Sequence, residues 1–168
     1  MMNRRAVLTA GAVVSVLAVT NKFGEAQTMT ATNTIDYRAL SDMDWRQRLT
    51  ANQYMILRQH GTERPGSSAL NKEKRKGTFT CAGCDLPLFS SDTKFESGTG
   101  WPSFYQPLPN AVETKTDRSF FMTRNEVHCA RCLGHLGHVF DDGPPPTGLR
   151  YCMNGVAMKF VPEAKSSS

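Results

Sequence analysis

The five cysteines of this 168-residue chain divide by their spacing into two pairs and one single residue. The pairs form two Cys-x-x-Cys motifs, Cys81 with Cys84 and Cys129 with Cys132, and the single residue is Cys152. Two intervening residues let both thiolates of a tight turn face one ion, and four thiolates complete the tetrahedral shell of a structural zinc ion. The sequence therefore predicts one zinc ion bound by the four paired cysteines, and a free thiol at Cys152.

Other interpretations of the paired cysteines remain open. Two disulfides are a serious alternative if the protein is exported, because disulfides persist in oxidising compartments. A redox-active Cys-x-x-Cys pair would be expected beside a βαβ pattern, which this sequence does not show. His128 precedes Cys129 and is of a ligand type, but four thiolates already fill a tetrahedral site, so we predict no ligand role for it.

Cys152 lies between a cation and an amide in the run Arg150-Tyr-Cys-Met-Asn154. We predict one strand over residues 151–161, in which the side chains at alternate positions from 150 to 160 share a face. A guanidinium beside a thiol favours the thiolate and lowers the thiol pKa from about 8.5. The pattern therefore indicates an activated nucleophile, while the alternative is a buried cysteine that only packs.

Two histidines, His135 and His138, follow in the Gly-rich run Gly-His-Leu-Gly-His-Val-Phe. Histidine titrates near neutral pH, so either ring could give a proton to an oxygen that leaves a substrate. Single histidines in turns are more often without a catalytic role. A second metal site is conceivable, but two histidines with no matching acid or cysteine make a poor ligand set.

Trp101 follows the Gly-rich turn Ser-Gly-Thr-Gly and precedes a proline. Such a loop can hold the indole rigidly, and a rigid aromatic wall can contact a methyl or sulfur group of a ligand. Packing in the core explains Trp101 equally well.

The amino terminus has the pattern of an export signal. Adjacent Arg4 and Arg5 precede an apolar stretch over residues 6–19, which is too short to span a membrane but typical of a signal peptide. The twin arginines resemble those of the folded-protein export route, so residues 1–26 predict a cleaved signal and a bacterial periplasmic location. An uncleaved amino-terminal anchor is the alternative, and we expect no stable membrane anchor.

Charge gives no sign of a nucleic-acid partner. The formal net charge of +5 falls to +3 when residues 1–26 are removed, because they hold three basic residues and one acidic residue. The densest basic run, at residues 72–76, includes an acid and is typical of a solvated loop.

The remaining chain predicts a linker over residues 27–40 and one domain over 41–164. Ser41 can cap a short helix, and Thr50 can cap a second helix that Gly61 ends. From Gly77 onward turn residues recur between short β-branched or aromatic segments, for example 78–80, 119–123 and 151–161. The predicted class is α+β, mostly β, with short helices at the amino-terminal end.

Taken together and in order, these motifs resemble the B-type peptide methionine sulfoxide reductases. The motifs are Cys-Ala-Gly-Cys, Ser-Gly-Thr-Gly-Trp-Pro-Ser-Phe, Cys-x-x-Cys, Gly-His-x-Gly-His-Val-Phe-Asp-Asp-Gly-Pro and Arg-Tyr-Cys-x-Asn. The resemblance extends from about Asp44 through Gly61-Thr-Glu-Arg-Pro65 to Phe160. It implies two antiparallel sheets, a zinc ion held by four cysteines, and reduction of free or peptidyl methionine sulfoxide with a preference for the R epimer.

The resemblance also implies residue roles. Cys152 would attack the sulfoxide sulfur and become a sulfenic acid as methionine departs. His138, with His135, would protonate or orient the sulfoxide oxygen, and Arg150 and Asn154 would tune the thiolate. Trp101 would receive the methyl group.

The chain departs from the family pattern at Thr99. Many members have a cysteine there that resolves the sulfenic acid as a disulfide. With four cysteines on zinc, no thiol remains for this step, so we predict a one-cysteine enzyme that an external thiol such as a thioredoxin-like protein reduces. Gly155 stands where serine is common, and Gly66 where an aromatic residue is common.

Two other functions compete with this interpretation. One is a zinc-stabilised thiol sensor or binding module without reductase activity, in which Cys152 merely packs. The other is a thiol enzyme that reduces peroxides better than methionine sulfoxide. The cation and the amide beside Cys152 favour an enzyme over a binding module.

Overall fold

The computed structural model describes residues 35–117 and 124–164. The predicted signal peptide, the first part of the predicted linker and the predicted strand at 119–123 lie outside the described residues. No helix within the described part of the chain has the length and apolar character needed to cross a membrane.

Two short helices come first, as the sequence predicts. Helix α1 spans Asp42–Arg48 and α2 spans Ala51–Gln59. Ser41 and Thr50 cap them, and each forms a reciprocal capping box with the side chain three residues later. His60, rather than Gly61, is the left-handed residue after α2, with φ 54°. The helices contribute four buried side chains to the core, those of Trp45, Tyr54, Ile56 and Leu57, while Met43 and Met55 are exposed.

The domain's contacts begin within the segment predicted as a linker. Arg38 donates from Nη2 to the carbonyl of Ala130 over 2.6 Å and to the carboxylate of Glu113 over 3.1 Å. The ring of Tyr37 packs 6.2 Å from that of Trp45. Residues 35–40 therefore contact the domain, although the sequence assigns them to the linker.

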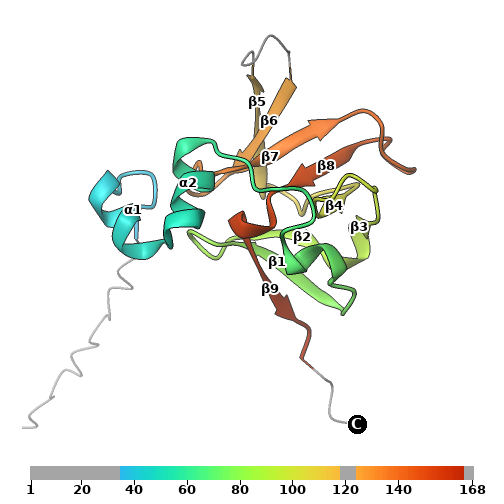
Figure 1. Cartoon of the computed structure of the whole chain (residues 1–168), viewed down its shortest axis with the longest axis horizontal. Helices are drawn as coiled ribbons and strands as arrows, with labels where there is room; N and C mark the ends of the chain where they lie inside the picture. The colour runs from blue at the N-terminus through green and yellow to red at the C-terminus, as the bar shows by residue number, and fades with distance from the viewer. Residues whose placement is uncertain (1–34, 118–123, 165–168) are drawn as a thin grey trace, which may run out of the picture. The chain divides into compact units, whose positions relative to one another are not determined.

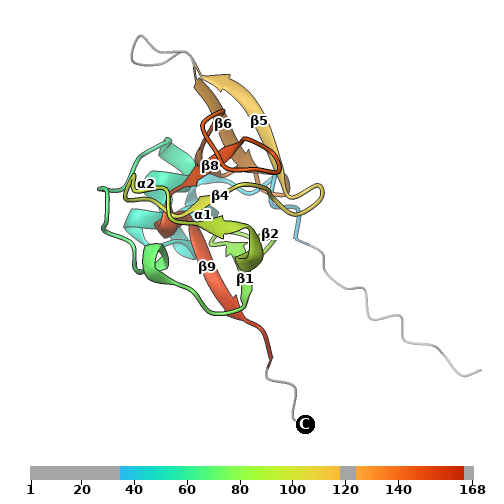
Figure 2. The same cartoon turned by 90° about the vertical axis from the view of Figure 1, so that its right-hand side faces the viewer.

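The described strands form two antiparallel sheets, which confirms the predicted class (Figures 1 and 2). The smaller sheet has the order β2-β1-β9, and the larger has the order β3-β4-β8-β7-β6-β5. The smaller sheet consists of β1 Gly77–Cys81, β2 Pro87–Ser90 and β9 Met158–Pro162. The larger consists of β3 Lys94–Phe95, β4 Ser103–Phe104, β5 Val112–Asp117, β6 Arg124–Cys129, β7 His135–Phe140 and β8 Arg150–Met153. Short 3-10 turns lie at Ala69–Lys72, Ser91–Thr93 and Gly155–Ala157.

A cluster of fully buried aromatic rings joins the two sheets. Phe104 of β4 stacks on Phe89 of β2 at 4.4 Å between centroids, and Phe79 of β1 meets Phe104 edge-on at 4.9 Å. All three side chains are excluded from solvent. Because one ring from the larger sheet contacts two from the smaller, the sheets share a single core.

The predicted single strand over 151–161 is wrong. Strand β8 ends at Met153, a 3-10 turn follows, and β9 pairs with β1 in the other sheet, as Figure 1 shows. The physical reason is the buried carboxylate of Glu63, which accepts hydrogen bonds from the backbone N–H groups of Gly155 at 2.7 Å and Val156 at 2.9 Å. These donors are therefore not available to a continuous strand ladder.

Candidate active site and metal centre

The four paired cysteines occupy two turns with the same backbone hydrogen bonds. In each turn, the N–H of the first cysteine donates to the carbonyl five residues later, and its own carbonyl accepts from the N–H four residues later. The residue after the second cysteine is left-handed in both cases, with φ 59° at Asp85 and 58° at Leu133. One turn joins β1 to β2 and the other joins β6 to β7, so the fold brings two distant hairpins together.

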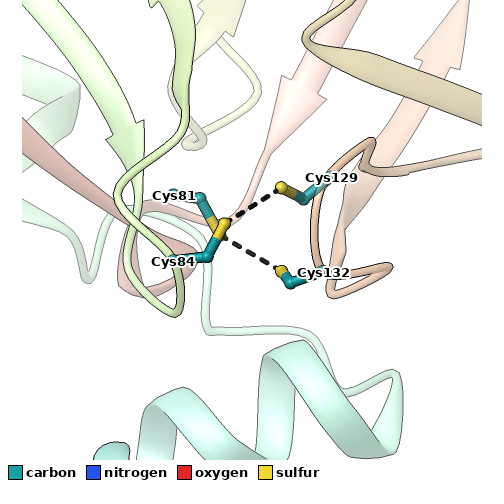
Figure 3. A group of neighbouring side chains, drawn as sticks. All are labelled: Cys81, Cys84, Cys129 and Cys132. Carbon is teal, nitrogen blue, oxygen red and sulfur yellow. Dashed lines mark hydrogen bonds between the residues drawn. The ribbon is translucent and has the colours of Figure 1, made fainter. Parts of the chain in front are cut away.

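The four sulfur atoms of these turns face one another (Figure 3). The Sγ atoms of Cys81 and Cys132 are 3.7 Å apart, those of Cys84 and Cys129 are 3.5 Å apart, and all four lie within 4.8 Å of one another. A tetrahedral zinc ion with Zn–S bonds of about 2.3 Å separates its sulfur ligands by about 3.8 Å. All five cysteines are free, so neither disulfide of the alternative interpretation is present. The buried quartet could hold a metal ion, and the donor set and spacing fit zinc.

Cys152 lies in β8 between the neighbouring strands of the larger sheet. It pairs with His138 of β7 on one side and with Ser103 of β4 on the other. Gly137 allows the close approach of β7, because a Cβ atom at that position would lie 2.1 Å from the carbonyl oxygen of Cys152.

A partly open cavity of about 130 Å³ adjoins the Cys152 side chain. Its walls include three of the residues that the sequence analysis singled out for chemistry, namely Trp101, His138 and Asn154. Thr62, Arg124, Gly137 and Phe140 complete them. A nucleophile, an imidazole and an indole therefore share one small cavity.

Glu63 fixes the indole and the amide through its backbone. The Nε1–H of Trp101 donates to the carbonyl of Glu63 over 3.2 Å, and the N–H of Glu63 donates to Oδ1 of Asn154 over 3.0 Å. The Asn154 amide also donates to the carbonyl of Leu136 over 3.0 Å. Both hydrogen bonds that the structure shows for this amide go to the backbone, so Asn154 holds the cavity wall in place.

The two histidines lie in different surroundings. His138 lines the cavity of Cys152, and its Nε2 is 3.0 Å from Oδ2 of Asp117. His135 is buried, and its Nδ1 is 2.8 Å from Oε1 of Glu126. Burial lowers the pKa of His135 despite the nearby carboxylate, so this ring is neutral at pH 7. His135 lines a neighbouring pocket, although its ring centroid is 5.4 Å from that of His138.

Comparison with known proteins assigns this arrangement to a family. Residues 49–162 match the model of the SelR domain. The chain is 58% identical over 123 residues to the peptide methionine sulfoxide reductase MsrB of Agrobacterium fabrum, covering 73% of this chain and 91% of that one. It is also 58% identical over 124 residues to the MsrB of Leptospira interrogans, with 73% of this chain and 95% of that one covered. It belongs to the B-type peptide methionine sulfoxide reductases.

Plant relatives carry the same domain in longer chains. The chloroplastic peptide methionine sulfoxide reductase B1 of Arabidopsis thaliana is 56% identical over 126 residues, which cover 74% of this chain and 62% of that one. Family membership identifies the protein as an oxidoreductase and argues against the binding-module alternative.

The electrostatics of the reductase cysteine differ from the sequence expectation. Burial raises the pKa of the Cys152 thiol, and Thr99 and Arg150 oppose the shift without outweighing it. Arg150 is committed elsewhere: its guanidinium forms two hydrogen bonds of 2.8 Å to Asp142 and lies 4.5 Å over the ring of Phe140. The predicted lowering of this pKa by Arg150 is therefore wrong in net direction, because desolvation of the thiolate is the larger effect.

A chain of hydroxyl groups leads from this thiol into the protein. Thr99 Oγ1 is 3.8 Å from Cys152 Sγ and 2.9 Å from Ser97 Oγ, which is 2.7 Å from Ser103 Oγ. Ser103 is fully buried and can also donate to the carbonyl of Trp101 over 3.1 Å. Either oxygen of the Ser97–Ser103 and Ser97–Thr99 pairs can donate, because a hydroxyl proton rotates. Thr99 can therefore accept from the Cys152 thiol and donate to the thiolate.

Sequence reasoning missed several residues that shape this reductase site. Ser97 and Ser103 lie within the quoted Gly-rich motif, and Glu63 lies within the quoted Gly-Thr-Glu-Arg-Pro motif, but no role was assigned to them. The partners Asp117 and Glu126 have no local signal, because their proximity to the histidines depends on the register of β5, β6 and β7.

Proposed function

We propose that this reductase converts methionine-R-sulfoxide, peptidyl or free, to methionine with Cys152 as the nucleophile and an external thiol as the reductant. The observation that carries the proposal is the shared cavity of Cys152, His138 and Trp101 in a member of this family. The cavity is small, which suits a methyl sulfoxide group at the end of a side chain or free amino acid.

The chemical step transfers one oxygen atom and two electrons. The Cys152 sulfur attacks the sulfoxide sulfur and bonds to it. This sulfur–sulfur bond and the substrate's sulfur–oxygen bond then break, methionine departs, and the oxygen ends on Cys152 as a sulfenic acid. Methionine sulfur is reduced and cysteine sulfur is oxidised, while the thiol proton accounts for the proton of the sulfenic acid.

Proton transfer must accompany this step, because the resting Cys152 is a thiol. The raised pKa of Cys152 keeps its sulfur protonated at pH 7. The thiol proton leaves as the sulfur attacks and ends on the oxygen of the sulfenic acid, while the Thr99 hydroxyl can donate to the sulfur as its negative charge develops. His138 faces the same cavity, and Asp117 orients its ring, so His138 can protonate the departing oxygen. His135 acts behind His138 as a positioning residue.

The cavity walls supply substrate contacts. Trp101 receives the ε-methyl group on an indole face that the Glu63 carbonyl holds in place. Arg150 acts on the thiolate from its ion pair with Asp142. Asn154 positions the end of β8 through its two backbone hydrogen bonds.

An external thiol completes the cycle. The other four cysteines are grouped in the buried quartet, and Thr99 stands beside Cys152 at the place where many members of the family carry a resolving cysteine. The sulfenic acid therefore reacts with one external thiol to release water and form a mixed disulfide. A second thiol then releases the reduced enzyme. A thioredoxin-like protein is the proposed donor.

The proposed cofactor is one structural zinc ion. Cys81, Cys84, Cys129 and Cys132 would hold it, and it would supply a crosslink between the β1–β2 and β6–β7 turns without taking part in the reaction. The proposed location is the bacterial periplasm, with residues 1–26 removed as a twin-arginine signal.

Turnover on separated epimers tests the proposal. We expect methionine to form from the R epimer and not from the S epimer with dithiothreitol, and again with thioredoxin and its reductase. Cys152→Ser should abolish turnover while leaving the melting temperature unchanged within a few degrees. Turnover by this variant would remove Cys152 as nucleophile, and faster reduction of hydrogen peroxide than of the R epimer would favour the peroxide-reducing alternative.

A further inference from the structure

Three side chains from three different elements converge beside the cavity of Cys152. His60 follows α2, Glu126 lies in β6 and His135 begins β7. The Nδ1 atoms of His60 and His135 are 2.9 and 2.8 Å from the same oxygen, Oε1 of Glu126, and the two rings are 5.3 Å apart. The sequence pattern shows no matching acid for a ligand set at its paired histidines, but the fold places Glu126 of β6 and the ring of His60 beside His135.

We propose that His60, Glu126 and His135 form a second cation site, separate from the cysteine quartet, for a divalent transition-metal ion such as Ni²⁺ or Zn²⁺. Two imidazoles and one carboxylate are a common ligand set for such ions, which bind at about 2.0–2.2 Å and fill their remaining positions with water. The three ligand atoms lie within 4.8 Å of one another, so a single ion between them can reach all three.

Binding exchanges two hydrogen bonds for three metal–ligand bonds. A carboxylate oxygen only accepts, so each imidazole now donates from Nδ1 to Glu126. On ion binding, each ring presents an Nδ1 lone pair and carries its proton on Nε2. The exposed ring of His60 can make this change in contact with solvent. The Nε2 of His135 is buried without a partner in either tautomer, so the number of unsatisfied atoms stays the same.

The surroundings allow an ion to enter. His60 is the exposed member, and Glu126 and His135 are the buried ones, so the cluster runs from the surface inward. The adjoining pocket has room for water. Its charged walls are balanced: besides Glu126 they include Asp117, Lys115 and Arg124. The two cations weaken the attraction for a divalent ion, which predicts a site that fills reversibly.

An ion at this site would act on the reaction through His135. The His135 ring packs at 5.4 Å, edge-on, against His138, which lines the Cys152 cavity. Holding His135 on a metal ion restrains its neighbour, so we expect occupancy to slow oxygen transfer. This consequence rests on the proposed function, whereas ion binding itself does not.

Calorimetric titration with Ni²⁺ tests the site. The protein should be the full zinc-loaded chain with Cys152→Ser, which removes the one thiol outside the quartet, in a buffer without chelating groups. We expect one Ni²⁺ per chain with no loss of zinc. His60→Gly, which keeps the left-handed position after α2 favourable, should weaken binding at least about tenfold, and Glu126→Gln should do the same.

His128→Ala is the matched control, because His128 faces one carboxylate, Glu113, at 3.3 Å without a second imidazole. Its Ni²⁺ affinity should equal that of the parent. Absence of one-to-one uptake, or uptake that His60→Gly leaves unchanged, would overturn the proposal. If Glu126→Gln does not fold, His60→Gly decides alone, because His60 is exposed and lies outside the reaction site.

A single-turnover assay on the pre-reduced wild-type enzyme tests the consequence without added thiols, which would bind the metal. Ni²⁺ should slow methionine formation, and His60→Gly should remove this inhibition while leaving the uninhibited rate unchanged. Inhibition equal in both proteins would contradict coupling through this site. Failure of the uninhibited reaction would contradict the proposed function, while the calorimetric result would still stand.

Discussion

At the scale of single residues, Cys152 is half-buried, and its surroundings act on the thiol pKa in opposite directions. Desolvation raises the pKa of its thiol, while the Thr99 hydroxyl and the Arg150 guanidinium lower it. Reactivity therefore depends on groups that accept the thiol proton or stabilise the anion when substrate arrives. The Thr99 hydroxyl is one such group, 3.8 Å from the sulfur.

Removing the Thr99 hydroxyl should make Cys152 less reactive. In Thr99→Val the thiolate loses a donor, so the Cys152 pKa should rise and alkylation by iodoacetamide at pH 7 should slow about fivefold, because a lost hydrogen bond to a charged group destabilises that charge. The rate of Cys152 modification measured from pH 6 to pH 10 should shift to higher pH. Thr99→Ser keeps the hydroxyl and should match the wild type, and a valine variant with an unchanged profile would contradict this role.

His138 should contribute to the rate rather than to substrate binding. Replacing it with asparagine removes a proton donor from the cavity wall, and general acids contribute about 10² or more to such rates. We expect kcat on the R epimer to fall by about this factor with little change in KM. His128→Asn, a change outside the cavity, should leave kcat as it is, and equal kcat values in both variants would exclude His138 as the acid.

At the scale of elements, the site depends on the junction where β8 leaves the larger sheet. Glu63, in the segment after α2, accepts from Gly155 and Val156 with its carboxylate and contacts Trp101 and Asn154 with its backbone. One residue therefore holds the Trp101 indole and the end of β8, the strand of the proposed nucleophile, in place.

Glu63→Gln should weaken this junction. An amide has only one accepting oxygen, so one backbone N–H would face an NH₂ group, and an unsatisfied buried donor costs about 1–3 kcal/mol. We expect a loss of that size in the free energy of unfolding measured with urea, and a higher KM because Trp101 is less well held. Glu96→Gln, at an exposed carboxylate, should change neither quantity. Equal stability of the two variants would show that the Glu63 clamp is unimportant.

At the scale of the whole molecule, the cysteine quartet ties together segments far apart in the chain. Cys81 is the last residue of β1 in the smaller sheet and Cys129 the last of β6 in the larger sheet, and Cys84 and Cys132 lie in the turns that follow. The aromatic cluster joins the sheets elsewhere, so the quartet adds a second connection between them. A metal ion there would stabilise the folded state by its whole binding free energy.

Loss of the metal should therefore unfold the domain. Binding of structural zinc contributes on the order of 10 kcal/mol, which is comparable to the entire stability of a small domain. Cys84→Ser should lose the metal in elemental analysis and lower the melting temperature by about 20 °C or more. Cys152→Ser removes a cysteine outside the quartet, so this variant should keep the bound metal and the wild-type melting temperature. A metal-free protein with the wild-type melting temperature would contradict this prediction.

Much of the fold and the family assignment could be predicted from short stretches of sequence. The spacing within each Cys-x-x-Cys turn, the two capped helices and the β-rich remainder depend on local backbone geometry, which a short stretch of sequence specifies. The family motifs are also local, so the reductase assignment needed no coordinates. These predictions agree with the fold and with the comparisons.

The tertiary structure decided which groups surround the sulfur of Cys152, and which of these groups already form hydrogen bonds to other residues. Arg150 stands two residues before Cys152 in the sequence, yet its guanidinium forms two hydrogen bonds to Asp142. The hydrogen bond from the Thr99 hydroxyl is the largest single influence that lowers the pKa of Cys152. Glu126 meets His60 and His135 only through the packing of β6 and β7 against the end of α2. These contacts join residues that lie from 8 to 66 positions apart and meet only through strand register and packing. Desolvation depends on everything packed around a group, so neither effect is encoded in a short sequence pattern.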